Sequence, residues 1–180
     1  MNYFYKMNAL HDHFARIRTF IFDVDGVLTD GSVGALASGE QFRTFNIRDG
    51  YGIEQAIKAG FNVAIVSAGN QDGVRKRLEF LKVKNSNVFM GGPTDQKVNA
   101  YLGYLTRDAL TESEVLYMGD DLPDYEILVR PALLSTCPAD AADEILAVCD
   151  YVSPKPGGRG AVRDVIEQVM KAQGKWQMGR

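Results

Sequence analysis

Residues that would bind soft metals or form disulfides are scarce in this chain of 180 residues. It has two cysteines, Cys137 and Cys149, and neither lies in the spacing of a metal site or a redox motif. Both are therefore expected to be reduced thiols in or near the core of a cytoplasmic protein. The two histidines, His11 and His13, lack the acidic and cysteine ligands of a metal site and are expected to face solvent from a helix.

Strong net charge and long apolar runs are also missing. A formal net charge of −3 gives no electrostatic basis for binding nucleic acid. No segment approaches the roughly twenty apolar residues that a membrane-spanning helix needs. Residues 1–16 do not resemble a secretory signal, because polar side chains such as Asp12 and Arg16 interrupt them. With 46% apolar and 24% charged residues, the chain suits one compact domain with a full core.

Strand and helix patterns alternate along the chain, without repeats or a low-complexity linker. Short apolar runs predict strands at Thr19–Phe22, Phe61–Val66, Asn87–Met90, Val115–Met118, Ala132–Ser135 and Asp150–Val152. Helices are expected at about Gly50–Ala59, Asp72–Leu81, Asp95–Leu105, Pro123–Val129, Ala139–Val148 and Gly160–Ala172. This alternation is typical of an α/β Rossmann-like fold, a doubly wound and mostly parallel sheet with helices on both faces.

One segment departs from this alternation. In residues 32–46, two short β-prone stretches flank Ala37–Glu40, which predicts a small β-hairpin. We expect an N-terminal extension, residues 1–16, followed by a single domain, residues 17–176. The hairpin would be a flap on that domain, and residues from about 153 to 180 would form a C-terminal tail.

Two carboxylates follow the first predicted strand. Asp23 and Asp25 end the apolar run Thr19–Phe22, and Gly26 then lets the chain turn sharply. Open α/β sheets bind their ligands at the carboxyl ends of the strands, so the pair indicates a functional site. The segment Asp23–Gly26 could instead form an ordinary turn. A calcium loop is disfavoured, because the third oxygen ligand before the glycine and the closing glutamate of an EF-hand are missing.

A second acidic cluster follows another predicted strand. Val115–Met118 leads into Gly119, and Asp120, Asp121 and Asp124 come directly after it. If both clusters meet at one sheet edge, two charges about 4 Å apart repel by roughly 4 kcal/mol at an effective dielectric near 20. A hard divalent cation would offset this repulsion, and Mg²⁺ typically binds one or two carboxylates, waters and phosphate oxygens. The sequence therefore predicts a site for a hard divalent cation such as Mg²⁺.

Two further polar positions could contact a phosphate. Ser67, Ala68 and Gly69 follow the strand Phe61–Val66, where a hydroxyl and free backbone N–H groups can cradle an anion. A helix-capping serine would give the same pattern. Lys97 is expected about one turn into a helix that begins near residues 94–95. Taken alone, it would be a solvent-exposed surface lysine.

In their order and spacing, these residues resemble the four motifs of the haloacid dehalogenase superfamily of phosphohydrolases. Additional stretches are similar to its small branch of 3-deoxy-D-manno-octulosonate 8-phosphate phosphatases, which supply a sugar of lipopolysaccharide. They are Arg48–Ile53, Gly157–Arg163 and Ala172–Lys175. The resemblance covers about residues 17–175. A related branch that acts on a nine-carbon sugar acid phosphate usually lacks arginines at positions 48 and 159.

The resemblance implies a Mg²⁺-dependent phosphatase that works through an aspartyl-phosphate. Asp23 would be the nucleophile and Asp25 the general acid and base. The metal would be held by the carboxylates of Asp23 and Asp120 and by the backbone carbonyl of Asp25. Ser67, Ala68 and Lys97 would bind the phosphate, and Asp121 and Asp124 would support the site. Arg48 and Arg159 would bind the sugar carboxylate.

The resemblance also implies that no cap domain covers the site. It predicts instead a homotetramer in which the hairpins pack together and the tail reaches a neighbouring active site, with Pro154–Gly160 as a mobile, positively charged lid. Two alternatives stay open, a phosphatase of the nine-carbon sugar acid and a non-catalytic assembly module. The chain departs from its relatives at Ala68 and Gly69, where a glycine and a larger polar residue are usual, and in a longer loop before Lys97.

Overall fold

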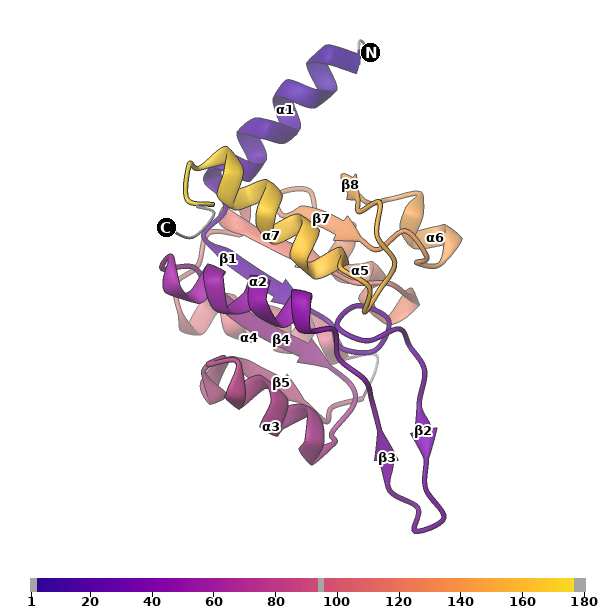
Figure 1. The fold of residues 1–180 in the computed structure, drawn as a ribbon. Helices are drawn as coiled ribbons and strands as arrows, with labels where there is room; N and C mark the ends of the chain where they lie inside the picture. Colours follow the sequence, from indigo (N-terminus) through magenta and orange to yellow (C-terminus); the bar gives the residue numbers. More distant parts are fainter. Residues whose placement is uncertain (1–2, 94–95, 177–180) are drawn as a thin grey trace.

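The core of the molecule is a six-stranded parallel sheet, as predicted (Figure 1). The computed structural model describes residues 3–93 and 96–176. The strands run in the order β5-β4-β1-β6-β7-β8. Their bounds are β1 Thr19–Phe22, β4 Asn62–Ser67, β5 Val88–Met90, β6 Val115–Met118, β7 Leu134–Cys137 and β8 Tyr151–Val152. β1 lies at the centre of the sheet and pairs with both β4 and β6.

Helices cover both faces of this sheet (Figure 1). They are α2 Ile47–Lys58, α3 Asp72–Phe80, α4 Lys97–Arg107, α5 Tyr125–Leu128, α6 Asp143–Leu146 and α7 Ala161–Ala172. α1 Tyr3–Arg16 packs against α7 and projects beyond the sheet (Figure 1). Successive residues of a strand point to opposite faces. Phe20 and Phe22 of β1 therefore join a core with α2, α3 and α7, whereas Ile21 joins a second core with α4, α5 and α6. None of the helices in the described ranges is long and apolar enough to span a membrane.

Most predicted elements differ from the structure in their bounds, and α2, for example, begins at Ile47, three residues earlier than predicted. α6 has four residues, because the N–H groups of Ala139 and Ala142 bond to Lys155 and Asp120 rather than within a longer helix. β7 begins at Leu134, two residues later than predicted, and extends to Cys137. α4 begins at Lys97, and its expected start near residues 94–95 lies outside the described residues.

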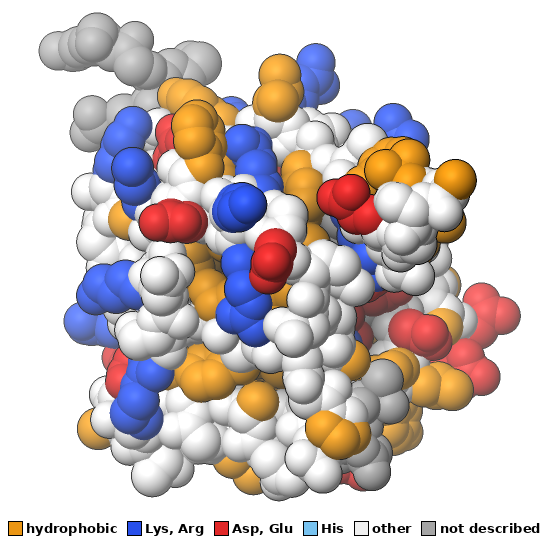
Figure 2. All heavy atoms as spheres, turned by 90° about the horizontal axis from the view of Figure 1, so that it is seen from below, with side chains coloured by type: hydrophobic (Ala, Val, Ile, Leu, Met, Phe, Trp, Pro, Cys, Tyr) orange, Lys and Arg blue, Asp and Glu red, His pale blue; other side chains and the backbone are white. Residues whose placement is uncertain are grey.

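The predicted hairpin is present and projects from the sheet (Figure 1). β2 Gly34–Ala35 and β3 Gln41–Phe42 pair antiparallel, and the ring of Phe42 packs on Gly34. Val33, Leu36 and Phe42 expose nearly half of their surface. Figure 2 views this end of the molecule and shows apolar groups among basic and acidic ones. No cap domain occurs within residues 3–93 and 96–176, where the hairpin is the one insertion between the strands and helices of the layered core.

Candidate active site

The predicted motif residues meet at the carboxyl ends of three adjacent strands. β4, β1 and β6 are parallel neighbours, so their last residues reach the same edge of the sheet. A cavity of about 280 Å³ opens at this edge. Its lining includes Asp23, Asp25, Ser67, Ala68, Lys97, Asp120, Asp121 and Asp124. Residues far apart in the chain thus form one site.

The turn after β1 depends on glycine. Gly26 has a positive φ of 81°. A Cβ added there would lie only 1.8 Å from a carboxylate oxygen of Asp120. The turn is closed by the N–H groups of Leu28 and Thr29, which both donate to the carbonyl of Val24. Glycine at this position therefore lets the first acidic loop approach the second.

Lys97 is a buried member of the site rather than a surface lysine. Its amino group donates to Asp23 Oδ2 at 2.6 Å and to Asp124 Oδ1 at 3.0 Å. Burial acts to lower the pKa of Lys97, but Asp124 and Asp23 outweigh it and hold the pKa above its usual value. The side chain is therefore a fixed positive charge in the cavity.

Three carboxylates gather around this charge. Asp23, Asp120 and Asp124 each place an oxygen within 4.8 Å of the others. Burial raises the pKa of Asp23 to about 7, with repulsion from Asp124 adding to it and Lys97 opposing it. Burial likewise raises the pKa of Asp120 to about 8, helped by repulsion from Asp23 and Asp124. A cluster of hard oxygen ligands that repel one another fits a divalent cation such as Mg²⁺.

Asp124 supports its neighbours instead of facing the cavity freely. Its Oδ1 accepts hydrogen bonds from Lys97 and from the Tyr117 hydroxyl, and its Oδ2 accepts one from the N–H of Asp120. Asp121 is exposed and accepts from the N–H of Leu122, so it caps the 3₁₀ turn Leu122–Asp124. These contacts leave Asp23 and Asp120 as the side chains best placed to hold a cation.

Ser67 lies at the end of β4 and is buried. Its hydroxyl accepts the N–H of Gly69 at 3.3 Å, and it does not cap a helix, since α3 begins at Asp72 after Gln71. The capping interpretation is therefore wrong for this serine. A Cβ at Gly69 would lie 2.9 Å from the Gln71 side-chain oxygen, so Gln71 occupies space that a larger residue at position 69 would need.

Asp25 lines the same cavity but is not one of the three clustered carboxylates, and it pairs with Arg43 of the hairpin. Arg43 Nε donates to Asp25 Oδ1 at 3.0 Å, and Arg43 Nη2 lies 3.3 Å from Oδ2. The Arg43 side chain is only 6% exposed. Our sequence reasoning missed this residue. The signal that could have found it is a cation in the middle of the second predicted strand of the hairpin.

The two arginines expected to bind the sugar carboxylate lie elsewhere in this subunit. Arg48 is exposed near the start of α2, and Arg159 pairs with Asp30 at 3.1 Å. In the described part of the chain neither lines the cavity at the strand ends. Their substrate role stays a prediction.

The segment Pro154–Gly160 is hydrogen-bonded to its own subunit in this structure, and its role as a mobile lid stays a prediction. The N–H of Gly158 donates to the carbonyl of Val27 at 2.9 Å, and the N–H of Gly157 donates to Asp140 at 2.8 Å. A Cβ at Gly158 would lie 2.5 Å from the backbone of Thr29. The glycines therefore serve close packing against the loop that follows Asp25.

Asp49 binds the N-terminus of α7, which follows this segment. Gly160 precedes α7 with φ of 112° and offers no side chain to cap it. The buried carboxylate of Asp49 accepts the N–H groups of Gly160 at 3.1 Å and Arg163 at 2.8 Å. A residue of α2 thus caps α7, which fixes the loop beside the active site.

Comparisons with known proteins agree with this geometry. No family model matches the chain. It is 38% identical over 159 residues to the 3-deoxy-D-manno-octulosonate 8-phosphate phosphatase of Escherichia coli K12, an alignment that spans 88% of this chain and 82% of that protein.

Two solved structures have the same fold. The phosphatase of that name from Yersinia pestis superposes with a TM-score of 0.86 at 35% identity, covering 92% of this chain and 86% of the other. The enzyme from Moraxella catarrhalis, crystallised with magnesium, phosphate and KDO, gives a TM-score of 0.87 at 33% identity, covering 93% and 94%. The chain therefore belongs to the 3-deoxy-D-manno-octulosonate 8-phosphate phosphatase family of the haloacid dehalogenase superfamily.

Proposed function

We propose that this protein hydrolyses 3-deoxy-D-manno-octulosonate 8-phosphate and releases the free sugar acid for lipopolysaccharide synthesis. The observation that carries the proposal is the buried Lys97 held between Asp23 and Asp124 in an acidic cavity. A lysine fixed in this way can bind phosphate oxygens next to a carboxylate nucleophile. The relatives in E. coli and Y. pestis bear the name of this activity.

In the first step of the proposed mechanism, a carboxylate oxygen of Asp23 attacks phosphorus in line. A bond forms between that oxygen and phosphorus, while the bond from phosphorus to the sugar oxygen breaks. Asp25 donates a proton to the leaving oxygen. It then takes a proton from the water that attacks the aspartyl-phosphate, and inorganic phosphate leaves with Asp23 restored.

The other residues bind and orient the phosphate. Lys97, the Ser67 hydroxyl and the backbone N–H of Ala68 would hold its non-bridging oxygens as charge redistributes over them. Asp23, Asp120 and the backbone carbonyl of Asp25 would hold Mg²⁺. When bound there, Mg²⁺ supplies positive charge that offsets the repulsion between the nucleophile and the phosphate. Asp124 keeps Lys97 and the backbone of Asp120 in place.

The proposed assembly is a cytoplasmic homotetramer. Exposed Val33, Leu36 and Phe42 support packing of the hairpins against one another, and the free thiols Cys137 and Cys149 suit a reducing compartment. In the proposed assembly the tail of residues 153–180 reaches a neighbouring site. Native mass measurement tests the tetramer.

Phosphate release tests the activity. The purified protein would be assayed with and without Mg²⁺ on the eight-carbon and nine-carbon sugar acid phosphates, on a neutral hexose 6-phosphate and on p-nitrophenyl phosphate. We expect Mg²⁺-dependent turnover with the highest kcat/KM for the eight-carbon ester. A preference for the nine-carbon ester would identify the related branch. Absence of release from every ester, with Asp23→Asn giving the same blank, would favour the assembly module.

A further inference from the structure

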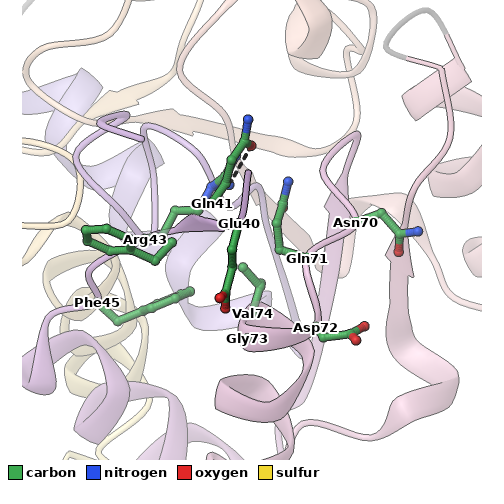
Figure 3. A pocket seen from close by; sticks show the side chains of 10 residues that line it. Glu40, Gln41, Arg43, Phe45, Asn70, Gln71, Asp72, Gly73 and Val74 are labelled. Atoms are coloured by element: carbon green, nitrogen blue, oxygen red, sulfur yellow. Dashed lines mark hydrogen bonds between the residues drawn. The ribbon is translucent and has the colours of Figure 1, made fainter. Parts of the chain in front are cut away.

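A second cavity, of about 460 Å³, lies between the hairpin and the start of α3 (Figure 3). Glu40, Gln41, Arg43 and Phe45 line it from the hairpin side, and Gln71 and Asp72 line it from the other side. Figure 3 shows the side chains of Glu40 and Gln71 next to one another, with the Glu40 carboxylate and the Gln71 amide at opposite ends. It is large enough for a small organic group. We name it the hairpin cavity.

The hairpin cavity adjoins the catalytic cavity along two walls. The loop after β4 lines the catalytic cavity with residues 67–69 and the hairpin cavity with residues 70–73. Arg43 lines the hairpin cavity and is bonded to Asp25, which lines the catalytic cavity. A phosphate ester bound at Lys97 would therefore place its organic part toward the Asp25–Arg43 pair.

The lining indicates which organic groups fit. Carboxylates and amides from Glu40, Gln41, Gln71 and Asp72 can accept or donate hydrogen bonds to hydroxyl groups. Arg43 is the one cationic residue that lines this cavity in the described ranges. A guanidinium presents paired donors that match a carboxylate. A polyhydroxylated group with one carboxylate satisfies both features.

The Asp25–Arg43 pair conflicts with the proposed chemistry as it stands. Both oxygens of Asp25 accept from Arg43 nitrogens, at 3.0 and 3.3 Å, so the guanidinium competes with a leaving oxygen for this carboxyl group. Arg43 Nη1 lies 3.4 Å from the Gln41 side-chain oxygen, which borders the hairpin cavity (Figure 3). One end of the guanidinium thus already faces the space where the organic group would lie.

We propose that Arg43 is a specificity-determining residue that transfers from Asp25 to the carboxylate of a substrate seated in the hairpin cavity. The transfer frees Asp25 to face the leaving oxygen. This inference rests on the proposed phosphatase function and assigns recognition of the substrate carboxylate to Arg43. An ester without a carboxylate leaves Arg43 on Asp25 and is turned over slowly even when bound.

Kinetics of Arg43→Ala, Arg43→Gln and Arg43→Lys test this inference on three esters, the eight-carbon sugar acid phosphate, a neutral hexose 6-phosphate and p-nitrophenyl phosphate. Removing the guanidinium should raise KM for the sugar acid phosphate about tenfold or more, with kcat within about threefold, because binding is lost while the chemistry remains. It should raise kcat for the neutral sugar phosphate severalfold, since Asp25 is released. Arg43→Lys keeps the charge without the paired donors and should give an intermediate KM.

Arg18→Ala is the matched control. Arg18 is an exposed arginine that pairs with Glu114 and lines neither cavity, so its loss should change no constant by more than about twofold. Circular dichroism identifies any variant that does not fold, and the other substitutions then carry the test.

The outcomes separate this inference from the proposed function. If kcat falls equally on all three esters in every folded Arg43 variant, Arg43 has only a structural role and the inference fails. If the wild-type enzyme prefers the neutral sugar phosphate, the proposed substrate fails and the inference fails with it. If the wild-type enzyme prefers the sugar acid phosphate and Arg43→Ala loses this preference, both the inference and the proposed function are supported.

Discussion

The amino group of Lys97 lies 2.6 Å from a carboxylate oxygen of Asp23, although 74 residues separate the two in the chain. The contact joins the start of α4 to the end of β1, and each side chain is less than a tenth exposed. Asp124 accepts a second hydrogen bond from the same amino group. One buried cation thus neutralises part of an acidic cluster and positions Asp23, the proposed nucleophile.

Replacing Lys97 with methionine keeps most of the side chain's volume and removes its charge. We expect kcat to fall by about 10²- to 10³-fold, because the phosphate oxygens lose a preorganised positive charge. Steady-state phosphate release measures this. Lys76→Met, on the exposed face of α3, is the control and should leave kcat unchanged. Activity of Lys97→Met near that of the wild type would contradict the proposed role.

Replacing either carboxylate of the first loop should stop turnover for different reasons. Asp23→Asn removes the nucleophile with little change in volume, so no phosphoenzyme should form. Asp25→Asn keeps the nucleophile but cannot move a proton, so a slowly hydrolysed phosphoenzyme should accumulate with a good leaving group. Rapid quench followed by intact-mass measurement distinguishes the two. Turnover by Asp23→Asn would rule out the nucleophile assignment.

The acidic cluster should make the stability of the metal-free protein depend on pH. The pKa of Asp23 rises from 3.8 to about 7 on folding, and that of Asp120 rises to about 8. Between about pH 4 and pH 8 the folded state therefore binds more protons than the unfolded chain, and its free energy of unfolding falls as the pH rises. The contribution is present at low pH and lost as the pH passes the folded-state pKa values.

Added Mg²⁺ should restore that stability where the carboxylates are ionised, because metal and protons compete for the same oxygens. Thermal unfolding in chelator and in Mg²⁺ should give curves that separate by several degrees near pH 8 and by little near pH 5. Asp120→Asn should remove the separation, and chelator should abolish activity. A gap in Tm that is equal at both pH values would argue against this site.

The central part of the fold and site was predictable because its signals are local. Apolar runs followed by Asp23, Ser67 and Asp120 indicate a strand, a turn and a functional side chain at the same place in the sequence. Parallel pairing of the strands then brings these three side chains to one edge of the sheet. Contacts that depend on packing between distant segments were not predictable. Arg43 meets Asp25 only through the path of the hairpin. The glycines at 157 and 158 looked flexible, yet they are used for close approach to the β1 loop.

The cap that Asp49 provides for α7 gives the last prediction. Asp49 is buried, and its carboxylate accepts two backbone N–H groups at the start of that helix. Burial raises its pKa, while the hydrogen bonds from Arg163 and Gly160 oppose the rise. Asp49→Ala should lower the free energy of unfolding by about 1–2 kcal/mol, the usual effect of losing a helix cap.

Asp49→Asn keeps one acceptor oxygen and should lose about half as much. Urea denaturation measures both variants, and the exposed Asp12→Ala on α1 is the control, expected to stay within about 0.5 kcal/mol of the wild type. Hydrogen exchange locates the effect, since the amides of Gly160 and Arg163 should exchange faster in Asp49→Ala. If the alanine variant unfolds with the wild type and protects both amides, then α7 is held by its apolar face alone, with no contribution from the Asp49 cap.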